Sequence, residues 1–149
     1  RLLVTEGLEL SGSLGWLDPE IKSDITVKGS SLRGNRPVNS PRWTFAGGID
    51  FNRPLSETLK LNMSLNANYR TAQYMEAVNA PSNLEPGYWL VNARIGIGNI
   101  DDRWALSAWV KNLTKSQYRI YVNDLPDFGW VLNAYGPPRV FGATLGFKF

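Results

Sequence analysis

Alternation of apolar and polar residues with a period of two is the feature that most constrains the fold of this 149-residue chain. Successive side chains of a β-strand point to opposite faces, so the pattern predicts strands with one apolar and one polar face. The clearest case is 59–70, where Leu61 and Leu65 share one face and Asn62 and Ser64 the other. The alternation recurs in six segments, which we expect to be strands at about 3–17, 42–52, 59–70, 88–98, 104–112 and 139–149.

The apolar faces of these segments carry no charge, although charged residues make up 19% of the chain. An Arg or Lys on the lipid side of a membrane barrel costs about 2–4 kcal/mol near the midplane, which explains such sorting. No apolar run approaches the roughly 18 residues of a membrane helix. A mean hydropathy of -0.25 still fits a barrel wall, because every second residue faces the lumen. We therefore predict an all-β, antiparallel, up-and-down transmembrane barrel wall of about six strands.

The polar register is expected to face the lumen of that barrel. Its charged members are Glu9, Asp50, Lys60, Arg70, Arg94 and Lys148. In a wide lumen they would be hydrated, or they would pair with charges on a segment packed inside. One bulky apolar residue, Trp109, also falls on this polar side.

The connections between the segments alternate in length. Long ones lie at 18–41, 71–87 and 112–138, and short ones at 53–58 and 99–103. Outer-membrane barrels have short periplasmic turns and long outer loops, so we place the long connections outside the cell. Aromatic residues gather at the strand ends, as interfacial girdles require. Trp16, Trp43, Tyr69, Tyr88 and Trp89 adjoin long connections, and Phe51, Trp104, Phe147 and Phe149 lie at the other rim.

Composition excludes several kinds of chemistry. The chain has no Cys and no His, so Cys/His metal sites and Ser-His or Cys-His catalytic pairs are absent. We expect no enzyme activity, no cofactor and no metal; Asp124 and Asp127 lie in one connection, but as a calcium site they are weak candidates. The net charge is +3 and the pI about 9.3, yet no Lys/Arg cluster indicates nucleic-acid binding.

The last residues of the chain indicate more closely which class of membrane protein this is. Phe141, Ala143, Leu145, Phe147 and Phe149 place an apolar residue at every second position back from a terminal Phe. This pattern is similar to the C-terminal signature by which outer-membrane proteins are recognised for barrel assembly. That resemblance implies the barrel assembly machinery as a partner and the outer membrane of a Gram-negative bacterium, with its lipid bilayer and lipopolysaccharide, as the location.

Three further stretches resemble TonB-dependent receptors. Residues 104–114 are similar to their penultimate strand, in which a tryptophan-led strand ends in Asn-Leu, here Asn112-Leu113. Residues 135–142 are similar to the Pro-Arg-x-Phe/Tyr-Gly start of their last strand, and 34–43 to the loop that returns into an earlier strand.

The resemblance implies a barrel of about 22 strands with an N-terminal plug inside it. The chain begins directly with a strand-like segment and without a signal peptide, so we expect it to be a C-terminal fragment. The plug, its contact to the TonB energy-transducing complex and the earlier strands would then be missing. About six strands cannot close a barrel, whose smallest bacterial form has about eight.

Receptors of this family take up scarce ligands such as iron-siderophores, cobalamin or glycans, which implies a ligand vestibule at the outer loops. Aromatic rings offer stacking surface, and arginines can meet anionic groups. The candidates in this chain are Arg33, Arg36, Tyr74, Tyr118, Arg119, Tyr121, Phe128, Trp130 and Tyr135. Packing between loops is the alternative role for each of them.

Two other functions stay open at this point. A passive porin would share the wall alternation but have no plug encoded upstream. A soluble β-sandwich that serves as a binding module would stay folded and monomeric without detergent, with its alternating apolar faces buried between two sheets.

Overall fold

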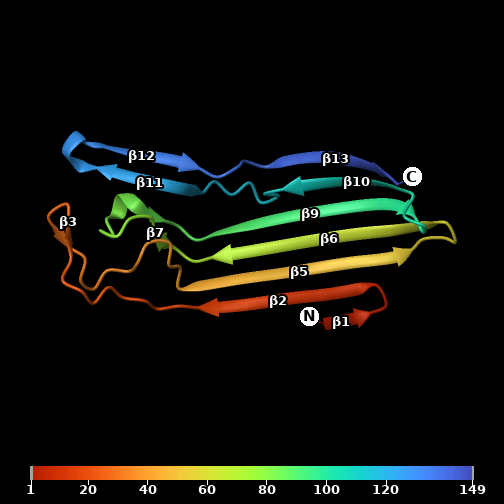
Figure 1. Cartoon of the computed structure of the whole chain (residues 1–149), viewed down its shortest axis with the longest axis horizontal. Coiled ribbons are helices and arrows are strands. Elements are labelled where there is room, and N and C mark those ends of the chain that lie inside the picture. The colour runs from red at the N-terminus through yellow and green to blue at the C-terminus, as the bar shows by residue number, and fades with distance from the viewer. Residues whose placement is uncertain (1, 149) are drawn as a thin grey trace.

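The computed structural model describes residues 2–148 and consists of β-strands with two short 3₁₀ helices. Seven strands form one antiparallel sheet, with the order β1-β2-β5-β6-β9-β10-β13. Their bounds are β1 Leu2–Thr5, β2 Leu8–Trp16, β5 Trp43–Pro54, β6 Leu59–Arg70, β9 Tyr88–Asn99, β10 Trp104–Lys111 and β13 Val140–Phe147. Each strand pairs with the next sheet strand along the chain, so the sheet is an up-and-down meander (Figure 1). The predicted all-β antiparallel architecture is confirmed.

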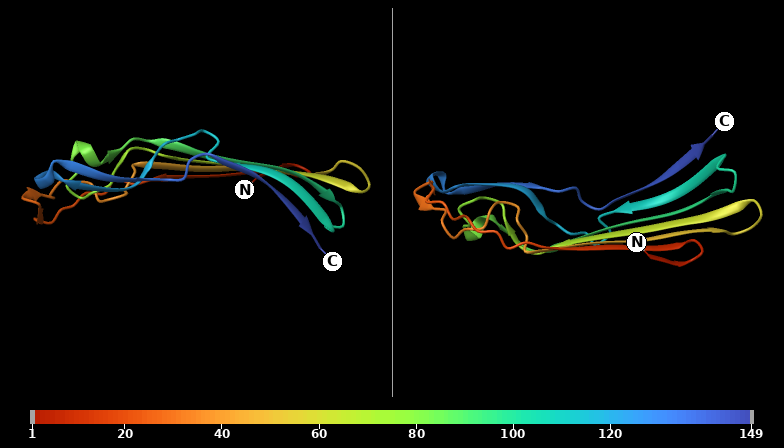
Figure 2. Two further views of the ribbon diagram at one scale, coloured as in Figure 1. Left: turned by 90° about the horizontal axis from the view of Figure 1, so that it is seen from above. Right: turned by 60° about the horizontal axis from the view of Figure 1, so that its bottom comes forward.

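The sheet is a curved and twisted open wall, as two further views show (Figure 2). Among residues 2–148, the outer edges of β1 and β13 pair with no other strand. Short turns and the chain end lie at one end of the wall, and the long connections extend beyond the other (Figure 1). No helix in the described part of the chain is long and apolar enough to span a membrane.

The prediction of a single strand over 3–17 is wrong. The structure divides this segment into β1 and β2, which pair antiparallel with Leu3 opposite Glu9. Gly7 turns the chain between them with φ of +81°, a left-handed conformation that glycine adopts without steric cost. The apolar residues Leu2, Leu3 and Val4 before the turn have the same strand-like composition as the residues after it. The turn therefore could not be recognised from the sequence pattern. The wall consequently has seven strands instead of about six.

The strand register places apolar side chains and polar side chains in separate rows across the sheet. One apolar row runs Leu8, Phe51, Met63, Ile95, Ala108 and Ala143, and its neighbour runs Leu10, Ile49, Leu65, Ala93, Val110 and Phe141. Between them, on the opposite face, runs the row Glu9, Asp50, Ser64, Arg94, Trp109 and Gly142. We call the two faces the apolar face and the polar face. Tyr88 lies directly opposite Arg70 and so on the polar face, not with the girdle rings with which the sequence pattern grouped it.

In the described part of the chain, no second layer covers the apolar face. Ile95 is 49% exposed and Leu145 is 58% exposed, and most large apolar side chains of the sheet are similarly open. A soluble sandwich would bury the apolar face between two sheets. Among the described residues, the seven-stranded sheet packs on no other sheet. The sandwich alternative is therefore wrong for this chain.

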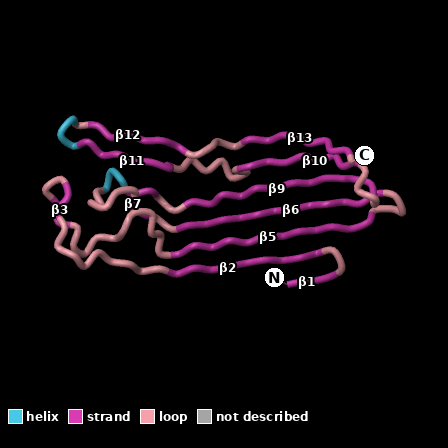
Figure 3. The backbone as a smooth tube through the Cα atoms, viewed as in Figure 1, coloured by secondary structure: helices cyan, strands magenta, loops and turns pink. Residues whose placement is uncertain are grey.

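The long connections contain structure of their own (Figure 3). Each carries a small two-stranded sheet: β3 Thr26–Val27 with β4 Ser30–Ser31, β7 Gln73–Tyr74 with β8 Leu84–Glu85, and β11 Arg119–Leu125 with β12 Trp130–Tyr135. The 3₁₀ helices η1 Pro81–Asn83 and η2 Pro126–Phe128 lie in the second and third connections. We call the connections 17–42, 71–87 and 112–139 together the loop assembly.

Candidate functional site

The first two connections of the loop assembly are joined through Asn79. Its side-chain oxygen accepts from the backbone N–H of Arg36 at 2.7 Å, and its Nδ2 donates to the Arg36 carbonyl at 2.9 Å. Asn35 adds donations to the carbonyls of Ala77 and Val78. Asn79 holds a φ of +57°, which asparagine tolerates better than most residues. Side-chain amides of each connection thus satisfy backbone groups of the other.

The third connection is tied to the second by a buried ion pair. Arg119 Nε lies 2.6 Å from Glu85 Oε2, and the two side chains are 16% and 5% exposed. The backbone N–H of Arg119 also donates to Glu85 Oε1, and its guanidinium donates to the carbonyls of Ser82 and Leu84. The charge and the donors of Arg119 are therefore used within the loop assembly, so it is a weak candidate for ligand binding.

Each of the three connections buries one apolar side chain. Within residues 2–148 the buried apolar side chains are Leu32, Met75 and Val122, one from each connection. Gln73 and Asn83 are buried beside Met75. The loop assembly is thus a packed unit, whereas loops of independent mobility would expose these groups.

Asn112 fixes the start of the third connection. It is buried with φ of +52°, its Nδ2 donates to the carbonyls of Ser116 and Pro137, and its Oδ1 accepts from the Ser116 N–H at 2.9 Å. These bonds hold the beginning of the connection against its end, and they explain physically why an Asn follows the tryptophan-led strand.

Tyr118 and Gly136 form the next contact of this connection. The Tyr118 ring stacks on Tyr88 with 4.7 Å between centroids, and the Arg70 guanidinium lies 5.4 Å from the Tyr88 ring centre. A Cβ placed on Gly136 would come within 2.1 Å of the Tyr118 ring. Only glycine therefore allows the ring to stack here.

We expect Gly136→Ala to displace the Tyr118 ring and to destabilise the third connection by about 1–3 kcal/mol, the cost of overpacking. Protease cleavage within 112–139 should accelerate accordingly. Gly146→Ala is the matched control, because a Cβ there meets no atom within 4 Å. Equal cleavage rates for the two variants would contradict this account of the stack.

The arginines predicted for a vestibule have other partners. Arg33 forms an exposed two-contact pair with Asp24, at 2.9 and 2.8 Å. Arg36 is held by its backbone to Asn79, and its guanidinium reaches the Leu17 carbonyl at 3.5 Å. Tyr74 lies in β7, where its carbonyl accepts from Asn39. These residues are spread over the loop assembly and do not converge on one pocket.

The predicted aromatic residues of the third connection are brought together instead. The pairing of β11 with β12 places Tyr121, Trp130 and Leu132 on one face of the hairpin, opposite the buried Val122. Their side chains are 50%, 53% and 47% exposed, and Phe128 at the tip is 73% exposed. Tyr135, at the base of β12, is also exposed. We call Tyr121, Trp130 and Leu132, together with Phe128 at the tip, the hairpin face; all four are exposed apolar or aromatic side chains. In Figure 1, β11 and β12 lie beyond the end of the wall.

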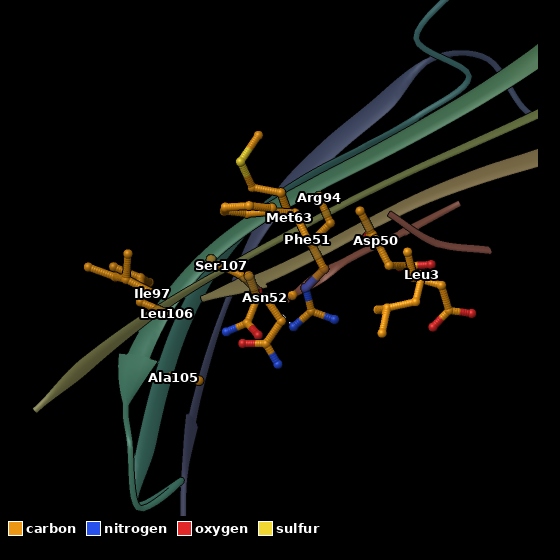
Figure 4. Close-up of a pocket in the computed structure, with 15 residues that line it drawn as sticks. Leu3, Asp50, Phe51, Asn52, Met63, Arg94, Ile97, Ala105, Leu106 and Ser107 are labelled. Carbon is orange, nitrogen blue, oxygen red and sulfur yellow. Dashed lines mark hydrogen bonds between the residues drawn. The ribbon is translucent and has the colours of Figure 1, made fainter. Parts of the chain in front are cut away.

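The polar face carries a groove of about 560 Å³ near the short turns. Its polar lining comes from Glu9, Asp50, Asn52, Asn62, Ser64, Arg94 and Ser107. In Figure 4, Arg94 and Asn52 project from one side of the strands and Met63 from the other. Arg94 donates to Ser107 Oγ at 2.9 Å, and Lys60 pairs with Asp102 at 2.6 Å. Glu9, Asp50, Arg94, Lys60 and Arg70 thus share this face.

Aromatic rings form a belt across the apolar face, at the end next to the loop assembly. Trp16 and Trp43 lie 6.3 Å apart between ring centres, and Trp89 contacts both Phe45 at 5.8 Å and Tyr69 at 4.9 Å. Rings of this kind are stable at the depth of lipid headgroups. Phe141, Ala143, Leu145 and Phe147 occupy the apolar register of β13, from the middle of the wall at Phe141 to its far end at Phe147. Phe149 of the predicted signature lies outside the described residues.

Comparison with known proteins identifies the family of this wall. The family model described as "TonB dependent receptor-like, beta-barrel" matches residues 3–113, well over half of the chain. The chain belongs to this family. The crystal structure of BauA, the ferric preacinetobactin receptor from Acinetobacter baumannii, is similar in fold, with a TM-score of 0.69 and 22% identity. The likeness covers 95% of this chain but only 20% of BauA. A comparison with curated proteins gave no match.

Membership of the TonB-dependent receptor family agrees with the prediction that the chain is not an enzyme, since the family consists of receptors. It also accounts for an open sheet, because the chain spans about a fifth of the length of BauA. Sequence reasoning missed the polar residues that organise the loop assembly, Asn79, Asn83 and Glu85. Their side-chain partners lie in other connections or across turns, and no local pattern reveals such contacts.

Proposed function

We propose that this chain forms part of the barrel wall of a TonB-dependent receptor in the outer membrane of a Gram-negative bacterium. The apolar face contacts lipid and the polar face lines the lumen. The long connections face outside, towards lipopolysaccharide, and the short turns face the periplasm. The separation of apolar and polar rows across the six strands from β2 to β13 is the observation that carries this proposal.

The complete receptor, on this proposal, contains further strands and an N-terminal plug that contacts the TonB energy-transducing complex. The last strand is presented to the barrel assembly machinery through Phe141, Ala143, Leu145, Phe147 and Phe149. Energy-coupled uptake of a scarce ligand, such as an iron-siderophore, is the proposed activity. Family membership favours this activity over the passive porin.

The hairpin face is the part of this chain that we assign to ligand contact. Four large side chains are exposed there together, and aromatic rings provide stacking surface at small conformational cost. Arg33 and Arg119 are already neutralised by Asp24 and Glu85. Ligand recognition by this chain therefore rests on apolar contact more than on charge.

Uptake in cells tests the activity. Cells that carry the complete receptor are given a panel of radiolabelled ferric siderophores, cobalamin and oligosaccharides, with and without an uncoupler of the proton-motive force. We expect uptake of one ligand to fall to the level of receptor-free cells when the uncoupler is added. Uptake that continues unchanged, and rises in proportion to concentration, would identify a passive pore instead.

A further inference from the structure

The alignment of the last strand, β13, with its neighbour β10 is not fixed by the features that align the other strands. Short turns join β5 to β6 and β9 to β10, and a short turn sets the register of the strands that it connects. A long connection, 112–139, precedes β13. The alternation does not fix the alignment either, because a shift by two residues keeps Phe141 on the apolar face and Thr144 on the polar face. Side-chain contacts across the pair are left to distinguish the observed alignment from the shifted ones.

One contact between the two strands depends on their alignment. Trp109 of β10 lies directly opposite Gly142 of β13, on the polar face. A Cβ on Gly142 would come within 2.6 Å of the Trp109 ring, so the ring occupies the space that any other residue would need for its side chain. The indole Nε1 donates to Thr144 Oγ1 at 3.2 Å, two residues further along β13. The half-buried ring thus covers the glycine and bonds the hydroxyl group.

The alignments shifted by two residues lose both parts of this contact. Either Val140 or Thr144 would then lie opposite Trp109, and both are β-branched, with two substituents on the Cβ. The ring could not keep its place over the strand. The residue beside the indole N–H would be Gly142 or Gly146, and neither has a side chain that accepts a hydrogen bond.

We propose that Trp109 sets the register of β13, because its ring fits the strand in one alignment, with Gly142 beneath the ring and Thr144 at the indole N–H. An aromatic ring over a glycine of an edge strand is one of the devices that fix strand register in sheets. The contact involves β10 and β13 alone. In the proposed receptor, β13 also pairs with a strand outside this chain, so a shifted register would displace that closing pair too.

Disulfide trapping in the complete receptor, without other cysteines, tests the register. Cysteines in place of Ala108 and Ala143 lie opposite each other in the observed alignment. Cysteines in place of Ala108 and either Phe141 or Leu145 come opposite each other only after a shift by two residues. In the observed alignment their Cα atoms are diagonal neighbours about 7–8 Å apart, too far for a disulfide. We expect Trp109→Ala to raise the share of shifted disulfides about tenfold, since a ring contact and a hydrogen bond are lost.

Glycine variants show whether the ring acts through Gly142. Gly142→Ala should raise the shifted share as Trp109→Ala does, because the new methyl group displaces the ring. Gly146→Ala, on the same strand and face, is the matched control, since a Cβ there meets no atom within 4 Å. In the Trp109→Ala background, Gly142→Ala should have no further effect. If Trp109→Ala fails to assemble, Trp109→Phe keeps a ring without the indole donor, and the shifted share should rise about two- to threefold.

A shifted share that stays at the wild-type level in the Trp109 variants and in Gly142→Ala would overturn this role of Trp109. Equal effects of Gly142→Ala and Gly146→Ala would overturn it as well. Neither result would affect the assignment of the two faces, because the observed and the shifted alignments place the same residues of β13 on the polar face.

Discussion

Replacing Leu65 by arginine should destabilise the assembled barrel by about 2–4 kcal/mol, the cost of an arginine on the lipid side near the bilayer midplane. Leu65 lies near the middle of β6, in the row with Ile49 and Ala93 on the apolar face. A loss of this size is a large fraction of the stability of a protein domain. The measurement is urea unfolding of the complete receptor in bilayers of defined thickness, with the folded fraction followed by its mobility on unheated gels.

Asn66→Arg is the matched control, one residue away on the polar face and opposite the neutral residues Gly48 and Asn92. We expect this change to leave the free energy of unfolding within about 0.5 kcal/mol, as for a substitution in contact with water. Equal destabilisation by the two variants would show that the two faces see the same environment. The assignment of the apolar face to lipid would then fail.

Arg119→Ala should open the loop assembly while the barrel wall stays folded. The substitution leaves Glu85 buried without its partner, and breaking a buried pair in this way costs about 3–5 kcal/mol. It also removes the guanidinium donations to the carbonyls of Ser82 and Leu84. Hydrogen exchange followed by mass spectrometry should show faster exchange in 71–87 and 112–139, with β5, β6 and β9 unchanged.

Arg33→Ala serves as the comparison, because the Arg33 and Asp24 side chains are 62% and 76% exposed. Exposed pairs contribute about 0–1 kcal/mol, so exchange in the first connection should change little. The double variant Arg119→Met with Glu85→Met should recover most of the lost protection, because no buried charge is left unpaired. If Arg119→Ala leaves exchange in both connections unaltered, the ion pair does not hold the loop assembly together.

The wall could be predicted from the sequence because its determinants are local. In β6 the type of each residue indicates the face on which its side chain lies. Leu61 and Leu65 lie on one side, and Asn62 and Ser64 on the other. With lipid on one side and water on the other, apolar and polar residues alternate at every second position of each strand. The pattern can therefore be interpreted without knowing the partner strand. Even Trp109, the exception in the pattern, lies on the polar face that its position predicts.

The β1–β2 turn and the loop assembly could not be predicted in the same way. The residues Leu2 to Val4, which precede Gly7, are apolar like those of a continuing strand. A lone glycine occurs in strands as well as in turns. In the loop assembly, the sequence makes Arg119 a candidate for ligand contact because arginines can meet anionic groups, with packing between loops as the alternative. Its partner Glu85 lies 34 residues earlier, and only the fold brings them together.

Labelling of single cysteines along β6, in a receptor without other cysteines, tests the central claim most directly; this chain itself contains none. Each residue from 60 to 69 is replaced in turn in the complete receptor and exposed, in native membranes, to a small hydrophilic maleimide. The account predicts labelling at 60, 62, 64, 66 and 68 and protection at 61, 63, 65, 67 and 69. Uniform labelling, or labelling at the odd positions alone, would contradict a wall with lipid on one side and water on the other.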